Sequence, residues 1–273
     1  TDPENPVTEV PDGSIVFDHV NFSYKKDSQE PVLKDINVSI RSGETIGIIG
    51  GTGSAKSSLV NLISRLYDVT DGSVLVGGID VRKYHLESLR NQVSVVLQKN
   101  VLFSGTILEN LRWGDKNATE EECRRACQLA CADDFIEKMP DKYNTFIEQG
   151  GSNVSGGQKQ RIGIARALAL EPDIIICDEA VSALDVSVQA QVLNLLQELK
   201  EKLGLTYFFI SHNLNVVYQV SDRVGVMYLG KMVEIANYDQ LYEKRYHPYT
   251  EALLSAIPIP DISMRGKNIQ TIR

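Results

Sequence analysis

The sequence is poor in cysteine, in basic charge and in long apolar runs, and each shortage excludes a class of protein. Four cysteines in 273 residues are too few for a disulfide scaffold, so we expect a reducing, cytoplasmic setting. No apolar stretch approaches the ~20 residues that a membrane-crossing helix needs, and no signal peptide opens the chain. Lys plus Arg number 28 against 36 Asp plus Glu, a formal charge of −8. A general nucleic-acid binder needs a basic face, so that class is disfavoured.

Short apolar runs separated by helical patterns are what the sequence does contain. Thr45–Ile49, Val93–Leu97 and Ile174–Cys177 are typical of strands buried on both faces of a parallel sheet. Helical periodicity follows at Ser57–Tyr67 and Val188–Leu203. This alternation predicts an α/β fold with a parallel sheet, in a chain long enough to bury a sizeable core.

Two further regions complete the predicted architecture. From Ile15 to Ile40 apolar and polar residues alternate, which predicts strands with one buried face. Residues 108–140 lack strand signals and predict a helical insertion. Cys123, Cys127 and Cys131 share one face of a predicted helix there, and we expect small buried thiols rather than a metal site.

A glycine-rich loop follows the first buried run and leads into a helical pattern. Converging backbone N–H groups and the positive end of a helix suit the β- and γ-phosphates of a nucleotide. We expect Lys56 to reach the same phosphates and the Ser57 hydroxyl to ligate Mg²⁺. A plain turn between strand and helix is the alternative, which the flanking pattern disfavours. The candidate nucleotide-binding residues are Gly50, Gly51, Thr52, Gly53, Ser54, Ala55, Lys56, Ser57 and Ser58.

One position departs from the usual phosphate-loop pattern, which has glycine where this chain has Ala55. We expect Ala55 to lie one residue into the helix with a negative φ, where a methyl group is harmless. The alternative is that the methyl group crowds the nucleotide.

Two carboxylates, Asp178 and Glu179, end the last of the three apolar runs. Strand C-termini are where ligands bind in open α/β sheets. We expect Asp178 to hold Mg²⁺, directly or through water, and Glu179 to polarise the attacking water. Neighbours on a strand point to opposite sides, which would separate the two roles. Alone the pair would indicate a solvated strand end; beside a phosphate loop it indicates a catalytic site.

With the segment Val154, Ser155, Gly156, Gly157 and Gln158, residues 15–234 resemble the nucleotide-binding domain of ABC transporters. The resemblance implies ATP and Mg²⁺ as ligands and further roles for single residues. Tyr24 would stack on adenine, Gln98 would touch Mg²⁺ and sense a membrane domain, and His212 would contact the γ-phosphate. Alone, each of these three residues would be ordinary packing or surface. Val154 stands where the family usually has leucine.

The resemblance also implies an assembly of two chains. Ser155, Gly156 and Gly157 would grip the γ-phosphate of ATP bound to the opposite subunit, and Asp185 lies in a loop that crosses the interface. A Ser-Gly-Gly turn before a helix is also by itself an anion-binding helix start. At the far end of a helical insertion it cannot serve the nucleotide at Lys56. We expect a head-to-tail dimer around two ATP molecules and a transmembrane partner domain, but no nucleic acid.

The two halves resemble different branches of that family. Upstream of about Gln160 the chain is similar to multidrug or lipid exporters. Downstream of about Ala165 it is similar to ATPase subunits of oligopeptide or dipeptide importers. We hypothesise an engineered chimera joined between Arg161 and Asp173; a divergent member of a single family is the alternative.

These observations predict a P-loop NTPase fold with a parallel sheet core, an antiparallel β subdomain and an inserted helical subdomain. The predicted activity is ATP hydrolysis on the cytoplasmic side of a membrane. The alternative is a folded scaffold that binds nucleotide weakly or not at all. The expected parts are a tail at 1–14, the first core segment at 15–97, a helical subdomain with the signature at 98–159, the second core segment at 160–235, and a helical extension and tail at 236–273.

Overall fold

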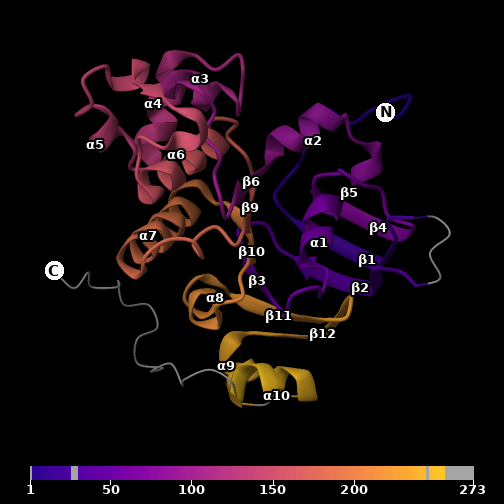
Figure 1. Ribbon diagram of the computed structural model, residues 1–273. Helices are drawn as coiled ribbons and strands as arrows, with labels where there is room; N and C mark the ends of the chain where they lie inside the picture. The colour runs from indigo at the N-terminus through magenta and orange to yellow at the C-terminus, as the bar shows by residue number, and fades with distance from the viewer. Residues whose placement is uncertain (1, 26–29, 244–245, 256–273) are drawn as a thin grey trace.

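The computed structural model describes residues 2–25, 30–243 and 246–255, and it has an α/β architecture (Figure 1). A six-stranded sheet in the order β12-β11-β3-β10-β9-β6 forms its centre. Neighbouring strands are parallel except β11 and β12, which are antiparallel. The strands are β3 (Thr45–Ile49), β6 (Val93–Leu97), β9 (Ile174–Asp178), β10 (Thr206–Ile210), β11 (Arg223–Tyr228) and β12 (Lys231–Ala236).

Both faces of the central sheet are covered, which explains the continuous apolar runs. Every residue of β3 and β10 is buried, and successive side chains enter opposite cores, as Phe208 and Phe209 do. The prediction of burial on both faces is wrong for β6. Because β6 is the edge strand, Val95 is 36% exposed and Leu97 is 49% exposed.

An antiparallel sheet lies against one face of the central sheet, on the right in Figure 1. The predicted alternation places Phe17 inward, opposite Val38 on one side and Val74 on the other. Its order is β2-β1-β4-β5. The strands are β1 (Ile15–Phe22), β2 (Leu33–Ile40), β4 (Asp71–Val76) and β5 (Ile79–Asp80).

The helical insertion forms a separate group of helices at the upper left of Figure 1. Capping boxes at Thr106, Thr119 and Ser155 start three of its helices, because each side chain accepts a backbone N–H and the Glu or Gln at N3 reciprocates. The elements are α3 (Ile107–Arg112), α4 (Glu120–Leu129), α5 (Asp133–Ile136), α6 (Gly156–Leu168), and the paired strands β7 (Gly105–Thr106) and β8 (Phe146–Ile147).

The cysteine prediction holds for two of three residues in this insertion. Cys123 and Cys127 are buried on α4, and burial raises the pKa of the Cys127 thiol to about 12. Cys131 is exposed because it lies beyond the end of α4 with a φ of 50°.

The remaining helices connect the strands or cover the C-terminal edge of the sheet. They are α1 (Lys56–Ile63), α2 (Leu86–Gln92), α7 (Val186–Leu203), α8 (Leu214–Val220), α9 (Tyr238–Glu243) and α10 (Pro248–Ser255). Short 3-10 turns form at Val81–Lys83, Lys142–Asn144 and Gln149–Gly151. α1 is shorter than predicted, since Arg65 has a φ of 48°. The expected tail at the end of the 236–273 segment lies outside the described residues, which end at 255.

The predicted α/β class, with a parallel core, an antiparallel β part and inserted helices, is confirmed. Within the part of the chain that the structure describes, no helix is both long enough and apolar enough to cross a bilayer.

Candidate nucleotide-binding site

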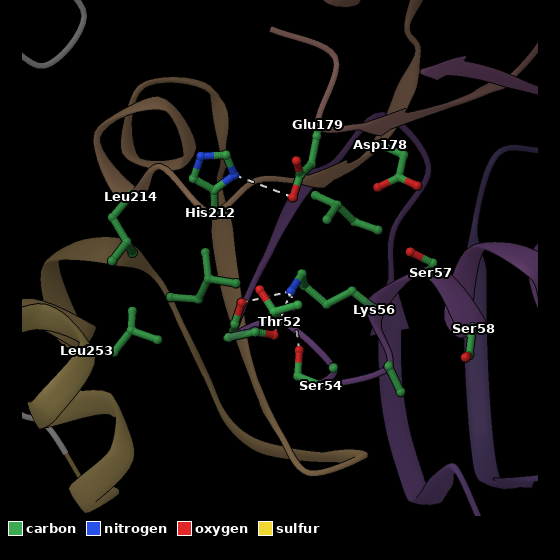
Figure 2. Close-up of a pocket in the computed structure, with 16 residues that line it drawn as sticks. Thr52, Ser54, Lys56, Ser57, Ser58, Asp178, Glu179, His212, Leu214 and Leu253 are labelled. Atoms are coloured by element: carbon green, nitrogen blue, oxygen red, sulfur yellow. Dashed lines mark hydrogen bonds and ion pairs between the residues drawn. The ribbon is translucent and has the colours of Figure 1, made fainter. Parts of the chain in front are cut away.

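A pocket of about 800 Å³ opens at the C-terminal ends of β3, β9 and β10 (Figure 2). The sheet register brings these ends together: Ile210 pairs with Ile48 on one side and with Asp178 on the other. Adjacent parallel strands therefore deliver the loop after β3 and the carboxylates after β9 to one place. The pocket is lined by Ile49, Gly50, Gly51, Thr52, Gly53, Ser54, Ala55, Lys56, Ser57, Ser58, Asp178, Glu179, Ile210, His212, Leu214 and Leu253.

The loop from Gly50 to Ala55 makes the bend between strand and helix. A side chain at Gly50 would overlap the carbonyl oxygen of Met227, so the close approach of β11 requires glycine there. Gly53 has a φ of 80°, a conformation that glycine adopts without cost. All nine predicted loop residues, Gly50 to Ser58, line the pocket.

Ala55 has a backbone conformation opposite to the one expected. Its φ is 73° and its ψ is 23°, in the left-handed region, and it is the N-cap of α1. The prediction of a negative φ is wrong because the helix begins only at Lys56, so Ala55 belongs to the turn. The left-handed conformation costs an L-residue about 1–2 kcal/mol.

The Lys56 ammonium is held over the loop by three acceptors (Figure 2). It donates to the carbonyl oxygens of Gly50 (2.7 Å) and Gly51 (3.1 Å) and to the Ser54 hydroxyl (3.2 Å). Burial lowers the pKa of Lys56, and the carboxylates of Glu179 and Asp178 act in the opposite direction. Because the half-buried Lys56 also lines the pocket, its ammonium can form a charge-assisted hydrogen bond with an anionic ligand there.

The two carboxylates line the same pocket rather than opposite sides of a strand. Asp178 is the last residue of β9, whereas Glu179 lies beyond it with a φ of 52°. The predicted alternation is wrong because Glu179 has left the extended conformation. The Glu179 N–H donates to the Ile210 carbonyl at 3.0 Å, and its own carbonyl accepts from the Ser182 hydroxyl at 2.9 Å. One Glu179 carboxylate oxygen lies 3.4 Å from Nδ1 of His212.

The charges of the pocket suit a divalent cation together with a polyphosphate. Burial raises the pKa of Asp178 and the neighbouring Glu179 raises it further, while Lys56 opposes both. The single ammonium of Lys56 cannot balance the two carboxylates and a triphosphate together, so the carboxylates would repel a triphosphate unless another cation were bound. Ser57 and Asp178 offer hard oxygen ligands, and Mg²⁺ typically combines one or two such groups with substrate phosphates. The residues present fit Mg²⁺.

Tyr24 and Gln98 are not among the residues that line the pocket. The Tyr24 hydroxyl is 3.0 Å from the Ser58 hydroxyl, and its half-exposed ring meets Phe22 and Tyr67 edge-on. Gln98 is exposed and directly follows Leu97, the residue paired with Asp178. Tyr24 therefore contacts a lining residue, Ser58, whereas Gln98 follows the strand that neighbours β9.

The segment from Val154 to Gln158 lies away from the pocket of its own chain. Ser155 caps α6, and a side chain on Gly157 would come within 2.8 Å of Val188, so α6 packs closely on the start of α7. Asp185 caps α7 by accepting the Val188 N–H at 3.0 Å. None of these residues is among those that line the pocket around Lys56.

The C-terminal helix α10 also contacts the pocket, which sequence reasoning missed. Leu253 lines it on the same side as Leu214 from α8 (Figure 2). The Tyr249 hydroxyl accepts the Gly51 N–H at 2.8 Å. These residues lie about two hundred positions beyond the loop, and no spacing rule connects segments so far apart.

Two sequence families match this chain. Residues 33–182 match the family described as "ABC transporter". Residues 233–273 match the "Oligopeptide/dipeptide transporter, C-terminal region".

Relatives and a solved structure agree with the first of these families. A putative multidrug export ATP-binding/permease protein, YgaD of Bacillus subtilis (strain 168), is 42% identical over 243 residues, covering 87% of this chain and 41% of the relative. A similarly described protein of Staphylococcus aureus (strain NCTC 8325 / PS 47) is 41% identical over 237 residues, covering 87% and 40%. The structure of a bacterial Atm1-family ABC exporter with ATP bound has a TM-score of 0.84 at 31% identity, covering 96% of this chain and 45% of that one. The chain therefore spans less than half the length of these relatives.

Proposed function

This chain belongs to the ABC transporter family, whose match covers more than half of its length, and from this premise we propose that it binds Mg²⁺-ATP at Lys56 and hydrolyses it. One observation carries the proposal: the phosphate loop after β3 and the carboxylates after β9 line one pocket. The pocket volume of about 800 Å³ is within the range of small-molecule sites.

Catalysis in such a site is positioning and electrostatics rather than covalent chemistry. Lys56 and the loop N–H groups bind the β- and γ-phosphates, and Ser57 and Asp178 hold Mg²⁺. When bound, Mg²⁺ neutralises phosphate charge. Glu179 orients a water molecule and accepts its proton, as the water oxygen bonds to the γ-phosphorus and the bond to the β–γ bridging oxygen breaks. His212, 3.4 Å from Glu179, supports that carboxylate and contacts the γ-phosphate.

We further propose that two chains assemble head to tail around two ATP molecules. The turn Ser155–Gly157 starts α6 away from its own pocket, which leaves it available to the nucleotide of a second chain. Tyr24 would stack on adenine, Gln98 would touch Mg²⁺ and sense the membrane domain, and Asp185 would lie at the interface. A transmembrane domain, on whose cytoplasmic side the dimer would bind, is the further partner we propose.

The central test is ATP hydrolysis by the purified chain. Glu179→Gln keeps the shape of the side chain but removes the proton acceptor, so we expect a loss of at least about a hundredfold in kcat, the scale of general-base catalysis. Glu198→Gln, an exposed carboxylate on α7, is the matched control and should hydrolyse ATP like the wild type.

The alternative is that the chain is a folded scaffold without activity. This alternative predicts no ATPase activity in the wild type or in any variant, and an unfolding temperature that Mg²⁺-ATP does not raise. A ligand that binds only the folded state must raise that temperature.

We also propose that the chain is an engineered chimera joined between Arg161 and Asp173, and the C-terminal family match is the observation that supports it. The C-terminal match is to an oligopeptide/dipeptide transporter region, whereas the relatives are described as exporters. Separate alignments of residues before 161 and after 173 test it. One natural protein that matches both parts equally well would contradict it.

A further inference from the structure

The peptide unit that joins Gly50 to Gly51 is held at both of its polar ends. Its N–H, on Gly51, donates to the Tyr249 hydroxyl at 2.8 Å. Its carbonyl, on Gly50, accepts from Nζ of Lys56 at 2.7 Å. A trans peptide is planar, with N–H and C=O pointing in opposite directions. Fixing the N–H therefore fixes the direction of the carbonyl, so that Tyr249 and Lys56 are connected through one rigid plane.

This peptide needs a restraint because its own residues supply little. The orientation of the plane depends on ψ of Gly50 and φ of Gly51, and glycine restricts neither angle as other residues do. Gly50 must be glycine because β11 passes close to it. A hydrogen bond from outside the loop is then the available means of holding the plane.

Tyr249 is itself held rigidly. Its ring packs on Tyr228 with centroids 4.3 Å apart, and its N–H donates to Nδ1 of His247 at 3.1 Å. The His247 N–H in turn donates to the Glu234 carboxylate at 3.3 Å, which ties the start of α10 to β12. One turn further, Leu254 is buried in the core. The hydroxyl is thus a fixed acceptor rather than a flexible surface group.

We propose that Tyr249 is a positioning residue for Lys56, acting through the Gly50–Gly51 peptide; this rests on the proposed ATP binding at Lys56. With the carbonyl of Gly50 held toward the ammonium, Lys56 stays over the loop before nucleotide arrives. Without the Tyr249 hydroxyl the plane rotates more freely, and part of the binding energy of ATP is then spent on ordering the loop. Tyr249 is not among the residues that line the pocket with Asp178 and Glu179, so we expect hydrolysis of bound ATP to be unchanged.

Tyr249→Phe tests this directly, since it removes only the hydroxyl. We expect KM for Mg²⁺-ATP to rise about fivefold, the effect of one neutral hydrogen bond, with kcat changed less than about twofold. Tyr246→Phe makes the same chemical change at a 78% exposed site in the same segment and should leave both constants unchanged. Equal KM values for Tyr249→Phe and the wild type would overturn the proposal.

A rescue variant separates positioning from a general structural role. Gly51 has no left-handed φ, so alanine fits its backbone and restricts rotation of the peptide. In the wild type an alanine Cβ would lie a tight 3.2 Å from the Tyr249 hydroxyl; Tyr249→Phe removes that oxygen. We expect Gly51→Ala to restore KM toward the wild-type value in the Tyr249→Phe background. No restoration would mean that Tyr249 acts by another route.

Amide hydrogen exchange of Gly51, measured by NMR without nucleotide, tests the contact independently of ATP. Exchange should be several-fold faster in Tyr249→Phe than in the wild type and in Tyr246→Phe. Equal exchange rates would overturn the contact itself. Failure of the wild-type chain to bind ATP would instead contradict the proposed function. Because the exchange rates are measured without nucleotide, they do not depend on that result.

Discussion

Ala55 has a strained, left-handed backbone conformation that the bend of the phosphate loop requires. Its left-handed backbone turns the chain so that α1 starts at Lys56, and the first residues of the helix line the pocket. Its methyl group is only half-buried against the core, because Ala55 also lines the open cavity, so burial offsets little of the conformational cost. Strain of this kind typically gathers at ligand-binding sites, where the surrounding structure enforces it.

We predict that Ala55→Gly raises the free energy of unfolding by about 0.5–1 kcal/mol, because glycine adopts a φ of 73° without strain. The larger entropy of glycine in the unfolded chain offsets part of this stabilisation. Urea unfolding monitored by circular dichroism measures the change. Ala190→Gly, inside α7, is the matched control and should be destabilising by about 1 kcal/mol. Destabilisation by Ala55→Gly would show that the left-handed turn is absent in solution.

At the scale of elements, Glu44 joins three strands near the base of the sheet. It lies in the turn between β2 and β3 and is only 4% exposed. Its carboxylate accepts from the Arg223 guanidinium of β11 and from the Arg41 N–H, and Arg223 also donates to the Ser39 carbonyl of β2. Burial alone would raise the pKa of Glu44, but the hydrogen bonds and charge of Arg223 and Arg41 outweigh it, so the pKa falls below 4.5.

Glu44→Gln should therefore lower the free energy of unfolding by about 1–3 kcal/mol near neutral pH, because it leaves Arg223 without its anionic partner. A depressed carboxyl pKa contributes stability that is present above pH 4.5 and is lost as the pH falls through the lower folded-state value. The difference between variant and wild type should narrow below pH 4.5. Denaturant unfolding at several pH values measures this difference in the free energy of unfolding. A difference that does not change with pH would refute the assignment of a charged Glu44 carboxylate in the folded state.

At the scale of the whole molecule, the phosphate loop and the Ser155–Gly157 turn face different nucleotides in the proposed dimer. Inactivating one element in each of two chains should then leave one complete site in a mixed dimer. In a monomeric enzyme the same two variants would stay inactive together, since no single chain would hold an intact site. Mixing thus distinguishes the two assemblies without a structure of the dimer.

We predict that Lys56→Ala and Ser155→Phe chains, each inactive alone, recover up to about a quarter of wild-type ATPase activity when mixed in equal amounts, because half the dimers are mixed and each has one intact site of two. Steady-state ATPase rates measure the recovery. Mixing Lys56→Ala with a chain carrying both substitutions is the control and should stay inactive. No recovery in the first mixture would contradict the head-to-tail arrangement.

Local pattern was enough to predict most of the central elements and the residues of the loop. β3, β6 and β9 follow the predicted apolar runs to within a residue. A strand covered on both faces, such as β3, is apolar at nearly every position, which is why such a run is visible in the sequence. The joint pocket of Lys56 and Asp178 also followed, because parallel strands end at one edge of a sheet. The apolar run Val93–Leu97 wrongly predicted burial on both faces, because the sequence does not show that β6 is the edge strand, on which Val95 is exposed.

The sequence by itself determined the chemistry of this protein: which side chains carry charge, which glycines permit a tight bend, and which strands bring them together. Only the tertiary structure decided the backbone of Ala55 and Glu179 and the contact of Tyr249 with Gly51. The physical reason is range. Periodicity and spacing record interactions within a few residues, whereas a left-handed turn or a contact between residues 198 positions apart depends on what the rest of the chain packs against it.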